Sequence, residues 1–182
     1  MHFEGTDIEG VFIVSSERNI DLRGWFARIY SRPEFAGGGL ELSPEQCSLS
    51  HNPKRGVVRG LHFQMPPHAE AKLVCCVAGS AFDVVVDLRR KSSTYGRAAW
   101  FPLSAERPSM IFVPEGCAHG FQTLEDHTTL LYMISVPYEG TAAAGIRWND
   151  PALGIPWPRH DDLLLSERDR ALPFLSELPP TF

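Results

Sequence analysis

Short apolar segments separated by turn residues recur along most of this chain, at intervals of about ten residues. Turn-forming groups stand between them, such as three consecutive glycines at 37–39 and Pro114-Glu115-Gly116. Regular short strands with almost no helical periodicity predict an all-β sandwich or barrel rather than alternating strands and helices. We expect one helix of note, near residues 161–169. The segments that suit strands are residues 8–14, 25–30, 46–50, 57–63, 71–78, 81–88, 98–103, 110–113 and 129–136.

The composition is that of an ordinary globular protein. With 182 residues, 43% hydrophobic and 21% charged, the chain has the size and apolar content for a single domain spanning 1–182. A net charge of −5 without a basic run argues against nucleic acid as a partner. No apolar stretch approaches the length of a membrane span, and the first residues lack a leader pattern. We therefore expect a cytoplasmic protein without a membrane partner.

The four cysteines, Cys47, Cys75, Cys76 and Cys117, have no CxxC spacing. We expect buried free thiols rather than disulfides or a zinc site. Cys75 and Cys76 are neighbours in an expected strand, so their side chains should point to opposite faces.

The segment Gly56–Gln64 places Arg59 three positions before His62 in a stretch that otherwise resembles a buried strand. Strict alternation would send these two side chains to opposite faces. A bulge at Gly60 would bring both to one face, as bulges beside active sites often do. The alternative is a half-buried histidine whose ring nitrogens are satisfied by the backbone.

Alternation in segment 81–88 places Phe82, Val84, Val86 and Leu88 on one face, which should be core. Asp83 and Asp87 take the other face together with Val85. A carboxylate in so apolar a strand either meets solvent or is paired with a donor, because an isolated buried carboxylate is costly. Both possibilities stay open.

The stretch Ile111–Phe121, where a strand ends in a Pro-Glu-Gly turn and returns through His119, resembles the second motif of the cupin superfamily. Residues 60–79 resemble a degenerate first motif. Metal-binding cupins carry a His-x-His pair there, and this chain has Gln64 two positions after His62. Metal sites favour several histidine or carboxylate ligands, so we expect no bound metal.

A set of ordered motifs resembles a closer family, the dTDP-4-dehydrorhamnose 3,5-epimerases, which are metal-free cupins acting on nucleotide-linked 4-keto-6-deoxy sugars. The resemblance implies a cupin-type jelly roll, or double-stranded β-helix, with a few short helices mainly near the C-terminus and no cofactor. It covers about residues 21–175. The motifs are Arg59-Gly-Leu-His62, Ala71-Lys-Leu-Val74, Phe82-Asp-Val84, Pro114-Glu-Gly116, His119-Gly-Phe121, Gly145-Ile-Arg-Trp-Asn-Asp-Pro151, Leu153-Gly-Ile-Pro-Trp-Pro158 and Leu165-Ser-Glu-Arg-Asp169.

The catalytic roles follow from this resemblance together with the chemistry. Epimerisation beside a ketone requires a base, a cation or donor at the ketone oxygen, and an acid on the opposite face. By resemblance His62 is the base and Asp169 orients it. Tyr132 is the acid that protonates C5, and Lys72 stabilises the enolate.

The same resemblance implies a set of substrate contacts. His119, oriented by Asp83, would line the sugar end of the site, and Arg59 and Arg23 would contact the diphosphate. Tyr138 would stack on the nucleotide base. At the base end this chain keeps Gln46 but departs from the family pattern at four other positions. Arg28 stands where the family usually has a glutamate, Ser48 where it has an asparagine, Ala143 where it has a second acidic contact, and Arg168 where it has a lysine.

These departures leave open a nucleotide other than thymidine and inversion at only one carbon. Two further alternatives stay open: a cupin that binds a sugar nucleotide without catalysis, and a metal-dependent cupin oxygenase or isomerase. The family resemblance also implies a homodimer. Edge strands in the N-terminal segment through Tyr30 need pairing or covering, so this segment should contribute to the interface.

Overall fold

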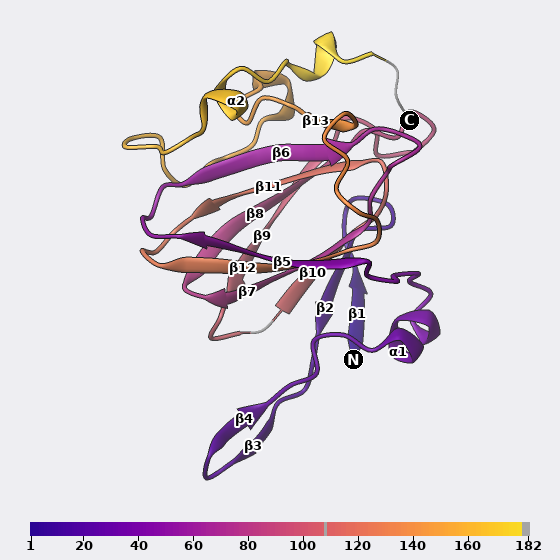
Figure 1. The fold of residues 1–182 in the computed structure, drawn as a ribbon, viewed down its shortest axis with the longest axis vertical. Coiled ribbons are helices and arrows are strands. Elements are labelled where there is room, and N and C mark those ends of the chain that lie inside the picture. Colours follow the sequence, from indigo (N-terminus) through magenta and orange to yellow (C-terminus); the bar gives the residue numbers. More distant parts are fainter. Residues whose placement is uncertain (108, 180–182) are drawn as a thin grey trace.

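Two antiparallel β-sheets facing one another form the body of the protein (Figure 1), in a computed structural model that describes residues 1–107 and 109–179. The prediction of an all-β sandwich is confirmed. The six-stranded sheet has the order β1 (His2–Gly5), β2 (Phe12–Ser15), β10 (Ser109–Val113), β7 (Lys72–Ala78), β12 (Thr128–Ile134) and β5 (Gln46–Asn52). The five-stranded sheet has the order β13 (Ala143–Gly145), β6 (Val58–Gln64), β11 (Cys117–Thr123), β8 (Ser80–Asp87) and β9 (Ala98–Ser104).

A small hairpin, β3 (Asn19–Asp21) with β4 (Gly24–Phe26), extends away from both sheets (Figure 1). The predicted strand at 25–30 is therefore wrong beyond Phe26. Residues 27–30 leave the hairpin and lead into α1 (Arg32–Gly37), where Tyr30 packs on Phe35 with ring centroids 5.1 Å apart.

Short helical turns follow the last strand: η1 (Pro151–Leu153), α2 (Glu167–Arg170) and η2 (Leu175–Glu177). The prediction of a helix over 161–169 is wrong except at its end. Leu164 instead forms a parallel bridge with Val57, and its carbonyl accepts from the N–H of Val58 at 2.9 Å. Extended backbone is thus hydrogen-bonded to the start of β6, and the helix begins only after Ser166, whose hydroxyl accepts from the N–H of Asp169.

The predicted alternation of β8 is confirmed, and neither face of the strand is exposed. Val85 lies in the core between the sheets with Val74 and Phe121. Val84 and Val86 pack on the outer side, in a cluster to which Leu153 and Trp157 of the C-terminal segment belong. Asp83 and Asp87 share the inner face with Val85 rather than the face that this segment covers, and both are fully buried.

The predicted bulge at Gly60 is confirmed. In the β6–β11 pair, His62 stands opposite His119 and Arg59 opposite Phe121, so two residues of β6 face one residue of β11. Gly60 has a φ of +109°, and an added Cβ would lie 2.7 Å from the carbonyl oxygen of His119. Only glycine fits this position, and the bulge lets Arg59 and His62 line the same pocket.

The four cysteines are free. Cys75, Cys76 and Cys117 are buried, as predicted, and burial raises the pKa of the Cys75 thiol to about 11. Cys75 and Cys76 belong to core clusters on opposite faces of β7. The prediction of burial is wrong for Cys47, which is exposed on β5. No helix within residues 1–107 and 109–179 is long and apolar enough to cross a membrane.

Candidate active site

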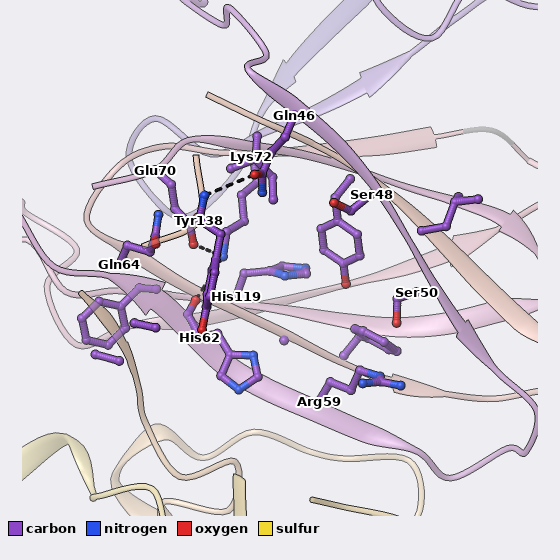
Figure 2. Close-up of a pocket in the computed structure, with 18 of the residues that line it drawn as sticks. Gln46, Ser48, Ser50, Arg59, His62, Gln64, Glu70, Lys72, His119 and Tyr138 are labelled. Atoms are coloured by element: carbon purple, nitrogen blue, oxygen red, sulfur yellow. Dashed lines mark hydrogen bonds and ion pairs between the residues drawn. The ribbon is translucent and has the colours of Figure 1, made fainter. Parts of the chain in front are cut away.

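A pocket with a volume of about 300 Å³ opens between the two sheets (Figure 2). This volume lies at the lower end of the range for small-molecule sites, about 300–1,000 Å³. Strands of both sheets line it, together with the loop after β12 and residues of β13 and α2. The polar side chains in its wall are Gln46, Ser48, Ser50, Arg59, His62, Gln64, Glu70, Lys72, His119, Tyr132, Tyr138 and Arg168.

Strand register brings the polar residues of the six-stranded sheet into this wall. Ser48 of β5 stands opposite Tyr132 of β12, and Lys72 of β7 stands opposite Ile134. Residues two apart on a strand share a face, so Lys72 and Tyr132 lie on neighbouring strands of one inward-facing surface. His62 and His119 belong to the other sheet.

His62 and Asp169 form a hydrogen-bonded pair, as the family resemblance implied. Nε2 of His62 lies 2.7 Å from Oδ1 of Asp169, which is 4% exposed. Burial works against the charge of Asp169, but the His62 hydrogen bond and contacts with Gly60 and Ser166 hold its pKa below the ordinary value. An ionised Asp169 accepts the Nε2–H, which directs the lone pair of Nδ1 away from Asp169 for use as a base.

His119 forms a second pair, with Asp83, and both residues are buried. The Nε2–Oδ2 distance is 2.8 Å. Burial raises the pKa of Asp83, although the charge and hydrogen bond of His119 oppose the shift. The open question about Asp83 is thereby answered, since it is paired with a donor rather than exposed.

Tyr132 stands edge-on to His119, with ring centroids 5.8 Å apart and planes at 76°. Burial, together with the nearby charge of Asp83, raises the pKa of its hydroxyl well above 10. The hydroxyl therefore keeps its proton at neutral pH. An acid on one sheet faces a base, His62, on the other.

The ammonium group of Lys72 is held at the inner wall by two oxygens. Oε1 of Glu70 lies 2.7 Å from Nζ, and the carbonyl oxygen of His62 lies 3.3 Å from it. Both side chains of the ion pair are more than nine-tenths buried. Lys72 is thus a fixed cation inside the pocket rather than a surface charge (Figure 2).

Arg59 and Tyr138 line the pocket and are exposed. Nε of Arg59 donates to Asn52, at 2.9 Å, which fixes the guanidinium. Tyr138 is 61% exposed, and its backbone N–H donates to the side chain of Gln46 at 3.2 Å. Arg168 also lines the pocket, where its guanidinium lies 3.5 Å from the carbonyl oxygen of Ala143.

Gln64 occupies the position where a metal-binding cupin has its second histidine, and its amide is committed to the backbone. Nε2 donates to the carbonyl groups of His68 and Pro137, and Oε1 accepts from the N–H of Glu139 at 2.6 Å. These bonds tie β6 to the loop that carries Tyr138. Among the described residues there is no group of three or more histidine, cysteine or carboxylate side chains that could hold a metal ion.

The structure does not bring two of the predicted substrate contacts, Arg23 and Arg28, to the pocket of their own chain. Arg23 lies at the turn of the projecting hairpin, 90% exposed and paired with Asp21. Arg28 is paired with Glu34 of α1. Neither residue lines the pocket of its own chain, so their role as substrate contacts stays a prediction.

Known proteins share this sequence pattern and fold. The family model described as dTDP-4-dehydrorhamnose 3,5-epimerase matches residues 5–177. The chain belongs to this family. A dTDP-4-dehydrorhamnose 3,5-epimerase of Sinorhizobium fredii is 39% identical to it over 182 residues, covering 100% of this chain and 93% of the relative.

Two solved structures extend the comparison. NovW, a 4-keto-6-deoxy sugar epimerase from Streptomyces spheroides, superposes with a TM-score of 0.92 at 40% identity, covering 97% of this chain and 88% of that one. ChmJ, a 3'-monoepimerase from Streptomyces bikiniensis solved with dTDP-quinovose, gives 0.89 at 33% identity, covering 95% and 87%. The comparisons confirm the predicted family, its cupin-type jelly roll and its enzyme class, an epimerase.

Sequence reasoning missed Glu70 and Ser50, which also line the pocket. Glu70 could have been found, because it stands two positions before Lys72 and extended backbone places such residues on one side. The same spacing relates Ser50 to the predicted Ser48.

Proposed function

We propose that this protein inverts carbons next to the ketone of a nucleotide-linked 4-keto-6-deoxy sugar, by removing a proton to form an enolate and returning one to the other face. The observation that carries the proposal is the pocket itself. It places a carboxylate-paired imidazole on one sheet, and a buried ammonium and a protonated phenol on the other.

Each group has a defined part in the reaction. Nδ1 of His62 takes the proton on carbon while Asp169 stabilises the imidazolium that forms. The ammonium of Lys72 stabilises the negative charge that develops on the ketone oxygen. The Tyr132 hydroxyl then donates a proton from the opposite wall, which inverts C5.

We further propose that the nucleotide diphosphate lies toward the mouth of the pocket. Arg59 is placed there to contact phosphate, and the exposed ring of Tyr138 offers a stacking surface for a base. Gln46, Ser48 and Arg168 supply hydrogen-bond donors beside it. A rim so rich in donors suits a base that presents carbonyl acceptors, with thymine as one case.

A second copy of the chain is part of this proposal. The hairpin β3–β4 exposes Ile20, Leu22, Trp25 and Phe26, at 77%, 108%, 52% and 65% respectively. Apolar side chains so exposed on a projecting hairpin are typical of an interface. In a homodimer the hairpin of one chain would bring its Arg23 to the diphosphate end of the pocket in the other.

The test is to incubate the protein with dTDP-4-keto-6-deoxyglucose in deuterated water and follow the sugar protons by NMR. We expect deuterium at one or both carbons next to the ketone, together with inverted product. His62→Asn is the matched variant, and its exchange should fall by roughly 10²–10⁴-fold, the usual contribution of a positioned acid or base. Exchange by the variant at the parent rate would remove His62 as the base.

The same experiment separates the alternative of a cupin that only binds. The sugar nucleotide would raise the thermal midpoint of such a protein, but all carbon-bound protons of the sugar would stay in place. If the dTDP sugar neither binds nor exchanges, the same sugar on uridine or guanosine diphosphate tests the base. Binding without exchange for every nucleotide would contradict the proposal.

A further inference from the structure

The ion pair between Glu70 and Lys72 places a carboxylate at the point where the proposed reaction develops negative charge. Both residues line the pocket (Figure 2). Both side chains are more than nine-tenths buried. Glu70 has no part in the proposed transfer of protons. Its presence beside the enolate stabiliser therefore requires a separate explanation.

A carboxylate here offsets the positive charge of Lys72. If Lys72 served to attract the anionic diphosphate, Glu70 would weaken it. If Lys72 instead donates a hydrogen bond to the neutral ketone, its position matters most. A donor stabilises an enolate best when it is already in place before the negative charge appears. The Glu70–Lys72 pair therefore suits a site in which the direction of the Lys72 N–H groups matters more than the net charge of the pocket lining.

The geometry supports this reading. An ammonium group has three N–H donors on a flexible four-carbon stem. Within the described part of the chain, Glu70 Oε1 at 2.7 Å and the carbonyl oxygen of His62 at 3.3 Å lie against Nζ. Two of the donors are thus occupied, and at least one remains for a ligand in the pocket. The bond to the carbonyl oxygen of His62 also links the position of Lys72 to β6, the strand that carries the proposed catalytic base.

The backbone that carries the pair is fixed as well. Glu70 and Lys72 flank Ala71 at the start of β7, and extended backbone places them on one side. The N–H of Ala71 donates to the hydroxyl of Ser135 at 2.9 Å, and its carbonyl accepts from the N–H of Ser135 at 3.0 Å. Both members of the pair are therefore anchored to the continuation of β12, the strand that carries Tyr132.

We propose that Glu70 is a positioning residue for catalysis: it holds the Lys72 ammonium with an N–H directed at the ketone oxygen of the substrate. The proposal rests on the proposed function. Without the carboxylate, Lys72 would exchange between conformers and hydrate in the pocket, so fewer bound substrates would meet a donor in place. Glu70 should then affect turnover more than binding, and only while Lys72 is present.

The test measures deuterium exchange into the sugar nucleotide, with kcat and KM determined separately. Glu70→Gln keeps the shape and removes the charge, and we expect kcat to fall about 10- to 100-fold, since a misplacement of about 1 Å can cost about 10²-fold. KM should stay within about threefold of the parent value. Glu115→Gln is the control, because Glu115 is exposed and outside the pocket lining, and it should match the parent.

A double variant separates positioning from other roles. In a Lys72→Met variant, adding Glu70→Gln should lower kcat little further, because the residue through which Glu70 acts is already absent. An equally large further loss would mean that Glu70 contacts the substrate itself and would overturn the proposal. So would a parent-like kcat for Glu70→Gln.

Folding is checked by the thermal midpoint of each variant. If Glu70→Gln does not fold, Glu70→Asp replaces it: the charge is kept but retracted by one methylene, so kcat should fall with KM retained, and a parent-like kcat overturns the proposal. A parent protein with no exchange on any sugar nucleotide is a different outcome. It would contradict the proposed function, and the role of Glu70 with it.

Discussion

His62 and His119 stand directly opposite each other on the antiparallel strands β6 and β11, and each imidazole is hydrogen-bonded to a different aspartate. The two aspartates differ in their electrostatics. Hydrogen bonds lower the pKa of Asp169 despite its burial, whereas burial raises the pKa of Asp83. The pair with the stabilised carboxylate is the one suited to general base catalysis, because an ionised aspartate can stabilise an imidazolium.

The first prediction concerns Asp169→Asn. The amide keeps the size of the side chain but loses the charge that stabilises protonated His62, so kcat should fall by at least about tenfold, and by less than the fall for His62→Asn. Substrate binding should change little, because Asp169 lies behind the imidazole. Steady-state kinetics on the three proteins check this, and a kcat equal to that of the parent would show that Asp169 does not assist the base.

The second prediction compares two buried aspartates of β8. Asp87 is buried, but hydrogen bonds from Arg89, Ser92 and Thr94 lower its pKa to about 2. A lowered pKa contributes stability above the unfolded value near 3.8, and this stability is lost as pH falls toward 2. Asp87→Asn should therefore lower the free energy of unfolding at pH 7 by about 2 kcal/mol.

Asp83 should behave in the opposite way. Its raised pKa means that the ionised carboxylate costs stability at neutral pH, and that this cost declines as pH falls below the raised value toward the unfolded value near 3.8. Asp83→Asn should be at least as stable as the parent at pH 7, while retaining a side chain that can accept from His119. Denaturant titrations of both variants at pH 7 measure the difference, and equal losses would refute the contrast.

Some residues of this site could be predicted from the sequence, whereas the burial of Asp83 could not. The motifs indicated His62, Lys72 and Asp169, and the family resemblance indicated Tyr132. In the structure His62, Lys72 and Tyr132 line the pocket from strands, and Asp169 of α2 is hydrogen-bonded to His62. Burial of Asp83 could not be predicted, because its face of β8 packs against the other sheet, where Val74 and Leu130 lie in one cluster with Val85. Burial of this kind depends on tertiary structure rather than on the local alternation of side chains.

The third prediction is that turnover survives chelation. Gln64 uses both ends of its amide to hold the loop that carries Tyr138, so it is not available as a ligand beside His62. The proposed enolate stabiliser is the ammonium of Lys72, which requires no Lewis acid. Activity should be unchanged after dialysis against EDTA. Loss of activity that a divalent ion restores would point instead to a metal-dependent cupin.

The fourth prediction concerns the hairpin. The parent should scatter light as a particle of twice the chain mass at micromolar concentration, and Leu22→Ser with Trp25→Ser should shift it toward the monomer, because these side chains expose apolar surface in the isolated chain. Arg23→Ala should leave the dimer intact and raise KM. A monomeric parent, or an Arg23 variant with parent kinetics, would contradict the shared site.

The last prediction separates the two walls of the pocket. Tyr132→Phe removes only the hydroxyl, while His62, Asp169 and Lys72 can still form the enolate. The variant should therefore keep proton exchange next to the ketone while inversion at C5 falls sharply.

The measurement that tests the account most directly follows deuterium label and configuration at C3 and C5 by NMR, for the parent and for Tyr132→Phe, on a 4-keto-6-deoxy sugar nucleotide in deuterated water. The account predicts inverted, labelled C5 in the parent and labelled but largely uninverted C5 in the variant. Equal inversion at C5 in both proteins would contradict it.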